Sequence, residues 1–184
     1  MAPPPTPIRL HVIGTSGAGK TTLAARIAER LNLQHTDVDA IHWGPNWTGC
    51  GEDVFDQRLR SATTGGRWVV SGNYRNVTDR VIADRVTTYV WLDYGRLCVT
   101  GRVVRRTFRR CLTRETLWAG NRESFRLSFF SRDSIILYSL RMHGRDRREY
   151  ATRLADSTQG RVVRLRSPRV AERWLHDQTA SHAT

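Results

Sequence analysis

One short segment restricts the possible folds of this chain more than any other. Residues 14–21 are GTSGAGKT and match the pattern G-x-x-x-x-G-K-[ST] at every fixed position. Residues 8–13, just before it, alternate polar and apolar side chains around β-branched residues, which is typical of a strand. After it, Leu23, Ile27 and Leu31 recur at the spacing of a helix. The sequence therefore predicts a strand, a glycine loop and a helix in that order.

This order is the setting in which such a loop, the Walker A motif, binds phosphate. Glycines let the backbone turn its N–H groups toward phosphate oxygens, and the following helix adds its positive end. Lys20 would reach the β- and γ-phosphates, and the Thr21 hydroxyl would coordinate Mg²⁺. The alternative is a glycine-rich turn that binds nothing. We expect ATP and Mg²⁺ to be bound here through Gly14, Ser16, Gly17, Ala18, Gly19, Lys20, Thr21 and Thr22.

The rest of the chain alternates between strand and helix patterns. Strands are predicted at residues 34–38, 68–70, 86–92 and 161–165, and helices at 52–63, from 96 onward and from 168 onward. This alternation predicts one α/β domain over residues 1–184, with a five-stranded parallel sheet and helices on both faces. Ligands of such sheets bind beyond the carboxyl ends of the strands. The polar residues predicted at those ends are Asp37, Asp39, Asn73, Asp93 and Ser167.

The charge balance favours anionic partners. The formal net charge is +13, and all 30 basic residues except Lys20 are arginine. Arginine binds phosphate through two parallel hydrogen bonds, although a coding bias toward arginine would also produce this surplus. A lysine kept only in the glycine loop indicates that arginine would not serve there. The three cysteines, Cys50, Cys98 and Cys111, have no CxxC spacing, which argues against a disulfide framework or a zinc site.

The sequence gives little reason to expect a membrane protein. It contains no run of about 18 apolar residues, the minimum for a spanning helix. Residues 1–7 are proline-rich and lack the basic and then apolar order of a signal peptide. We expect a disordered tail at residues 1–7 and a cytoplasmic location, with no membrane partner.

Five runs of sequence resemble a known family: GTSGAGKTTLAARIAERL, DVDAIHWGPNW, WVVSGNYRNV, VWLDYGRLCVTGRVVRRTFRR and LWAGNRES, in this order over residues 14–124. The family is the bacterial adenylate-kinase-like P-loop kinases often labelled DNA topology modulation protein. The small domain with an Arg-rich insertion also looks like the nucleoside-monophosphate and shikimate/gluconate kinases. The resemblance implies ATP-dependent phosphoryl transfer to a small molecule but does not identify that molecule. We expect first a nucleoside monophosphate and second a hydroxylated metabolite, which the Asp-x-Asp pattern favours, and a monomer or homodimer.

The resemblance to shikimate-type kinases gives roles to two carboxylates. By that likeness, Asp37 would hold Mg²⁺ through water, and Asp39 would orient the attacking hydroxyl and could deprotonate it. Both side chains would share one face of an extended chain. The alternative is a turn or cap at the strand end. No aspartate follows the third strand, where Ser71 stands instead, so the metal would depend on Thr21 and Asp37.

The acceptor-binding region is expected at about residues 40–65. Trp43 and Trp47 lie on a predicted loop and would either stack on a flat acceptor or pin the loop to the core. Asn73 and Arg75, after the third strand, would bind a polar or anionic group of the acceptor, unless they form a plain turn. Gly72 would let the backbone approach the acceptor.

Two arginines match the start of the lid in adenylate-type kinases. Arg102 and Arg106 follow Asp93 at the family's spacing and share one helical face. The resemblance implies that they clamp the ATP phosphates and stabilise charge on the moving phosphoryl group. It also implies an Arg-rich helical lid at about residues 107–130, with residues 120–123 at its tip or folded back on the site. Arg122 would contact the acceptor, and Pro168 would lie beside the adenine.

A second function class is left open by the charge distribution. Fifteen arginines but only five acidic residues lie between Arg96 and Arg153. Such a stretch is typical either of a solvated basic face or of a nucleic-acid-binding surface. The alternative to a kinase is therefore a nucleotide-regulated nucleic-acid-binding protein.

Overall fold

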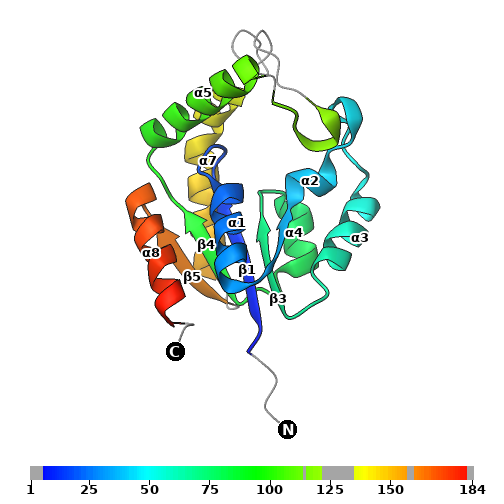
Figure 1. Ribbon diagram of the computed structural model, residues 1–184, viewed down its shortest axis with the longest axis vertical. Coiled ribbons are helices and arrows are strands. Elements are labelled where there is room, and N and C mark those ends of the chain that lie inside the picture. The colour runs from blue at the N-terminus through cyan, green and yellow to red at the C-terminus, as the bar shows by residue number, and fades with distance from the viewer. Residues whose placement is uncertain (1–5, 114, 122–134, 157–159, 182–184) are drawn as a thin grey trace.

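The fold is built on one parallel sheet. The computed structural model describes residues 6–113, 115–121, 135–156 and 160–181. The strands are β1 (Ile8–Gly14), β2 (Gln34–Asp37), β3 (Arg67–Ser71), β4 (Thr88–Leu92) and β5 (Arg161–Leu165). Their order in the sheet is β2-β3-β1-β4-β5, and every pairing is parallel (Figure 1). The predicted five-stranded parallel sheet is confirmed, and β1 lies at its centre.

The helices connect these strands. They are α1 (Lys20–Leu31), α2 (Val38–His42), α3 (Glu52–Ala62), α4 (Arg75–Ile82), α5 (Arg96–Thr113), α7 (Ile135–Asp156) and α8 (Pro168–Ser181), with 3-10 turns η1 (Pro45–Trp47) and η2 (Trp118–Gly120). The sequence predicted α1, α3, α5 and α8. It was wrong at α2 and α4, which were taken as extended chain and turn, because both helices are short and begin within a few residues of a strand end.

Helices cover both faces of the sheet, as predicted (Figure 1). Adjacent residues of a strand point to opposite faces, so Val12 packs with α1 and α8, whereas Ile13 packs with α3, α4 and α7. The pair Val90 and Trp91 in β4 divides in the same way. Strands buried on both faces read as almost continuous apolar runs, which is why they could be found in the sequence.

At the carboxyl end of β4 a buried carboxylate joins three elements. Asp93 accepts hydrogen bonds from Arg147 of α7 at 2.7 and 3.1 Å and from Arg164 of β5 at 2.9 and 2.6 Å. Burial alone would raise the pKa of Asp93, but these guanidinium groups outweigh it and hold the pKa below its ordinary value. The expectation that Asp93 faces the ligand is therefore wrong, since both of its oxygens are engaged in this internal network.

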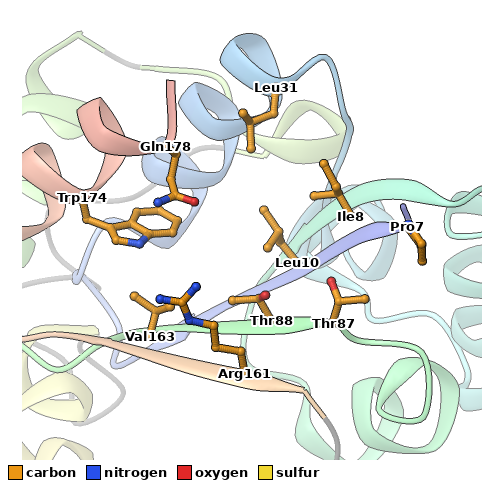
Figure 2. A pocket seen from close by; sticks show the side chains of 10 residues that line it. All are labelled: Pro7, Ile8, Leu10, Leu31, Thr87, Thr88, Arg161, Val163, Trp174 and Gln178. Carbon is orange, nitrogen blue, oxygen red and sulfur yellow. The ribbon is translucent and has the colours of Figure 1, made fainter. Parts of the chain in front are cut away.

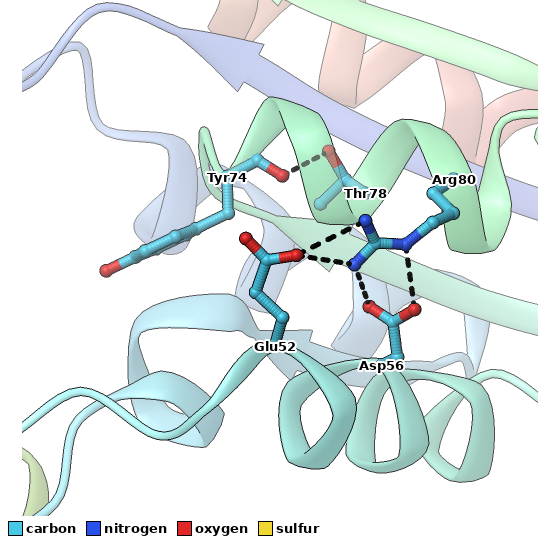
Figure 3. Close-up of polar contacts among 5 residues, drawn as sticks. All are labelled: Glu52, Asp56, Tyr74, Thr78 and Arg80. Carbon is cyan, nitrogen blue, oxygen red and sulfur yellow. Dashed lines mark hydrogen bonds and ion pairs between the residues drawn. The ribbon is translucent and has the colours of Figure 1, made fainter.

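Polar contacts hold α4 against α3 (Figure 3). Arg80 donates to both oxygens of Asp56, at 2.8 and 2.7 Å, and lies 3.5 Å from Glu52. These pairs are exposed to solvent, which screens them, so they add little to stability. The Thr78 hydroxyl donates to the carbonyl of Tyr74 at 3.0 Å. The phenol ring of Tyr74, the residue just before α4, points away from these contacts (Figure 3).

A cavity of about 240 Å³ lies at the opposite edge of the sheet from the glycine loop (Figure 2). Ile8, Thr88 and Arg161, which begin β1, β4 and β5, contribute to its lining, and Trp174 of α8 covers it. None of residues 14–21 lines it. Because this cavity is at the amino ends of the strands, it is not the site that the sequence predicts.

Two predicted segments are described only in part. Residues 107–113 of the expected lid belong to α5, while residues 122–130 lie outside the described ranges, so the lid stays a prediction. Most of the expected tail, residues 1–5, also lies outside them. Within the part that is described, no helix combines the length and apolar character needed to cross a bilayer.

Candidate active site

The glycine loop has the shape of a phosphate cradle. Gly17 and Gly19 have positive φ angles of 83° and 95°, a conformation that L side chains rarely adopt. A Cβ atom on Gly17 would lie 2.2 Å from Cγ2 of Val103, because α5 packs directly on the loop. The first turn of α1 contains no acidic residue that would offset its positive end. The loop could therefore receive an anion on its backbone N–H groups.

Lys20 lies among the charged side chains that the sequence predicted for the site. Its Nζ donates to the carbonyl of Thr15 at 3.2 Å. The residue is half-buried, but its ammonium group is removed from water, which lowers the pKa of Lys20 to about 8. The charges of Asp39 and Asp37 oppose this change, and that of Arg106 adds to it. These four side chains thus share one electrostatic environment.

Thr21 and Asp37 lie together as a pair of oxygen ligands would. The Thr21 hydroxyl is 3.5 Å from Oδ2 of Asp37. Burial and then the nearby charge of Asp39 raise the pKa of Asp37 to about 6. In the described residues no group of three or more His, Cys, Asp or Glu could hold a metal. Mg²⁺ in phosphoryl-transfer sites needs only one or two carboxylates, besides phosphate and water oxygens, and this pair fits that need.

Asp39 is not on an extended chain, which corrects the prediction. Asp37 ends β2 and caps α2, its Oδ1 accepting from the backbone N–H of Asp39 at 3.2 Å. Asp39 therefore lies in the first turn of a helix. The Tyr74 hydroxyl donates to Asp39, and the Trp43 indole N–H donates to that hydroxyl. Burial, followed by the charge of Asp39, raises the pKa of Tyr74, which keeps its proton for this contact.

A row of three tryptophans borders these carboxylates. The ring centroids of Trp43 and Trp47 are 5.7 Å apart, and those of Trp47 and Trp118 are 6.3 Å apart. Trp118 also hydrogen-bonds Asp37. Sequence reasoning missed Trp118 as a site residue, although it lies in the LWAGNRES run on which the family resemblance rests.

Asn121 holds this row in place. Its Nδ2 donates to the carbonyl of Gly44 at 2.8 Å, and its Oδ1 accepts from the backbone N–H of Trp47 at 3.0 Å. The side chain is buried. η2, which ends at Gly120, lies against η1, and this agrees with a segment that folds back on the predicted acceptor region. Arg122 is outside the described residues.

The segment after β3 supports the loop. Asn73 Nδ2 donates to the carbonyl of Gly14 at 2.6 Å, so one of its two N–H groups supports the phosphate cradle, and its contact with an acceptor stays a prediction. Gly72 makes room for Val38, whose Cγ2 would be 1.7 Å from an added Cβ, and its expected role beside the acceptor stays a prediction. The side chain of Arg75 is outside what the structure describes.

Helices α5 and α7 cover the phosphate side of the loop. Nη2 of Arg102 is 2.8 Å from where a Cβ of Gly19 would stand, so this guanidinium group borders the cradle. Arg106, one turn later, lowers the pKa of Lys20 by its charge. Ser139 of α7 donates to the carbonyl of Ser16 at 3.4 Å. Pro168 begins α8, and Ser167 caps this helix as predicted. The contact of Pro168 with adenine stays a prediction.

Comparisons with known proteins support this assignment of the fold. A gluconokinase from Sinorhizobium meliloti 1021 superposes with a TM-score of 0.50 and 16% sequence identity over 97% of both chains. The chain has a P-loop kinase fold. Because the sequence identity is low, this likeness concerns the fold alone.

Sequence relatives agree over shorter stretches. A cytidylate kinase from Maridesulfovibrio salexigens is 34% identical over 76 residues, which are 40% of this chain and 34% of that protein. The uncharacterized protein YqaC of Bacillus subtilis is 32% identical over 65 residues, 34% of this chain and 36% of that protein. The chain thus spans about a third of the length of these curated relatives. No protein-family model matches it, and the DNA topology modulation label stays a prediction.

We expect the affinity for ATP to fall as the pH rises through about 8. The pKa of Lys20 is lowered to about 8, so the ammonium charge is present below that pH and lost above it. Bound phosphates would raise the pKa of Lys20, so ATP would bind together with a proton whenever Lys20 starts neutral. The affinity should therefore fall about tenfold per pH unit above 8. Titration calorimetry at fixed Mg²⁺ would measure this. A flat profile to pH 10 would contradict it, and Lys20→Arg should remove the alkaline fall in any affinity it retains.

Replacing Asn121 with alanine should loosen the tryptophan row. The change removes both hydrogen bonds and leaves the Gly44 carbonyl and the Trp47 N–H without this partner. We expect a loss of about 1–3 kcal/mol in the free energy of unfolding, measured by chemical denaturation. Asn76→Ala, on the exposed side of α4, is the matched control and should change it by less than about 0.5 kcal/mol. Equal changes in the free energy of unfolding for the two variants would show that the hydrogen bonds of Asn121 do not stabilise this region.

Proposed function

We propose that this protein transfers the γ-phosphoryl group of ATP to a small-molecule acceptor with the help of Mg²⁺. The observation that supports this most directly is the position of Lys20, which donates to the Thr15 carbonyl in the phosphate cradle near the charges of Asp37 and Asp39. A phosphate-binding lysine and an acceptor-side carboxylate in one environment are what in-line phosphoryl transfer requires. A loop that only bound nucleotide would not need Asp39 so placed.

Each residue would have a defined task. The loop N–H groups and Lys20 would hold the β- and γ-phosphates, while Thr21 and Asp37 would hold the metal. Arg102 would offset charge on the phosphate oxygens, and Arg106 would assist it. Bound ATP supplies the phosphoryl group, and Mg²⁺ neutralises part of its charge. Asp39 would orient the acceptor for attack and accept a proton from it.

Two acceptor classes fit the comparisons. The cytidylate kinase is named for a nucleoside monophosphate, and the gluconokinase for a hydroxylated acid. Both are small molecules whose phosphorylation needs the same cradle. We therefore propose a small-molecule acceptor and extend neither relative's substrate to this chain by name.

The test is ADP formation from ATP with each acceptor class, measured by a coupled assay with and without Mg²⁺. We expect an acceptor-dependent rate that needs Mg²⁺ and falls about a hundredfold or more in Asp39→Asn. Asp84→Asn makes the same chemical change on an exposed carboxylate and should keep the full rate. If no acceptor raises ADP formation above that of the enzyme alone, the proposal is wrong.

A second candidate function follows from the basic surface. Exposed arginines line both α5 and α7, which pack against each other: Arg96, Arg105, Arg109, Arg141, Arg145 and Arg148. Such a surface could bind nucleic acid through its phosphates. Filter binding at 50 and 200 mM salt, with and without ATP, tests this. Affinity that falls steeply with salt would support it, and no retention at low salt would exclude it.

A further inference from the structure

The two carboxylates of the site already have protein donors. Asp37 accepts from the N–H of Asp39, from the Thr21 hydroxyl and from Trp118, and Asp39 accepts from the Tyr74 hydroxyl. A carboxylate has room for about four hydrogen bonds, so both keep lone pairs for another partner. What they can still bind is a hydrogen-bond donor or a cation. The Mg²⁺ proposed for Asp37 and Thr21 would use one of these places, and an acceptor molecule would meet Asp39.

This donor requirement separates the two acceptor classes. A hydroxyl group brings a donor to Asp39 and loses its proton there on attack. The phosphate of a nucleoside monophosphate brings only acceptor oxygens at neutral pH, and its negative charge would approach two carboxylates that already repel each other. The carboxylates therefore favour an acceptor that attacks through a hydroxyl oxygen.

The geometry of the tryptophan row restricts the shape of acceptor that fits beside it. The planes of Trp43 and Trp47 meet at 81°, and those of Trp47 and Trp118 at 75°, so successive indoles stand edge to face. This stepped arrangement presents single apolar faces and no parallel slot that would enclose a flat base. Trp47 has 38% of its surface exposed although Asn121 fixes its backbone, so its position is set while its ring meets solvent.

We propose that the acceptor is a polyhydroxylated ring, such as a sugar or a cyclitol, with its C–H face on Trp47 and one hydroxyl directed at Asp39. This inference rests on the proposed kinase activity. The hydroxyl oxygen forms a bond to the γ-phosphorus, the bond from that phosphorus to the bridging oxygen breaks, and the hydroxyl proton passes to Asp39. The products are ADP and a phosphate monoester of the ring.

The experiment compares three acceptor sets under one assay of ADP formation. The sets are monosaccharides with myo-inositol, the nucleosides cytidine and adenosine, and the monophosphates CMP and AMP. We expect acceptor-dependent ADP only in the first set, with a new phosphate monoester in the ³¹P NMR spectrum. Turnover of CMP, AMP or a nucleoside in place of the ring compounds would overturn the inference and leave the kinase activity standing. No turnover with any set would overturn both.

Variants of the tryptophan row test the shape argument on the acceptor that is found. Trp47→Leu should raise the KM for this acceptor about tenfold and leave the KM for ATP unchanged. The matched control is Trp174→Leu at the opposite edge of the sheet, which should change neither KM (Figure 2). An unchanged acceptor KM in Trp47→Leu, with the fold intact by circular dichroism, would remove Trp47 from the acceptor site.

Discussion

Replacing Lys20 with alanine should lower turnover about a thousandfold and greatly weaken ATP binding. In the native loop, the Lys20 ammonium group closes the cradle beside Thr15. After the substitution, only the backbone N–H groups would remain to bind the triphosphate. Preorganised charges aimed at a phosphoryl group are the largest single contribution in such sites, and the loss of one costs about a hundredfold to a thousandfold. No other lysine in the chain could substitute for it. Acceptor-dependent ADP formation measures the effect.

The control for this change lies on the same helix. Arg30 is exposed in the last turn of α1, about 15 Å along the axis from Lys20. Arg30→Ala removes one positive charge, as Lys20→Ala does, and should leave turnover within about twofold of the unaltered protein. A turnover in Lys20→Ala as high as in Arg30→Ala would mean that this cradle does not act on phosphate.

Replacing Gly72 with alanine should destabilise the fold by about 4 kcal/mol. Gly72 has a φ of 143°, which an alanine adopts only with strain. Its new Cβ would also lie 1.7 Å from Cγ2 of the fully buried Val38, so the start of α2 would have to move. Because Val38 stands between Asp37 and Asp39, activity should fall with stability. Chemical denaturation gives the free energy of unfolding.

Two further variants separate this contact from a general effect of alanine. Gly101 is in α5 with nothing within 4 Å of an added Cβ, so Gly101→Ala should stabilise the protein by about 0.5–1 kcal/mol. Adding Val38→Ala to Gly72→Ala removes the clashing methyl group and should recover part of the lost stability. A Gly72→Ala protein as stable as Gly101→Ala would contradict the packing described at the end of β3.

The sheet and the phosphate cradle could be predicted because their signals are local. Residues 8–31 contain a strand, three closely spaced glycines and a periodic helix within one short stretch, and each part limits the next. The strands β3, β4 and β5 are runs of apolar and β-branched residues bounded by breaks. Residues such as Lys20, Thr21 and Asp37 then follow from the rule that ligands bind at the carboxyl ends of strands.

The rest of the site depends on contacts between distant parts of the chain. Trp118 reaches Asp37 only because Asn121 holds η2 against the loop at Gly44, and no periodic pattern indicates that docking. Asp93 looked like a ligand by its position, but Arg147 and Arg164, much later in the sequence, engage it. Similarly, α2 has only five residues after its cap, Asp37. A helix this short has too few residues to show a helical period in the sequence.

The most direct test of the central claim is calorimetric titration of the purified protein with ATP, with Mg²⁺ present or removed by EDTA. The claim is that the backbone and Lys20 between residues 14 and 21 enclose a triphosphate whose metal is held by Thr21 and Asp37. It predicts one site per chain, with affinity for ATP that is at least tenfold higher with Mg²⁺ than without it. Absence of any binding, by ATP and by GTP, CTP and UTP, in the presence of Mg²⁺ would contradict it.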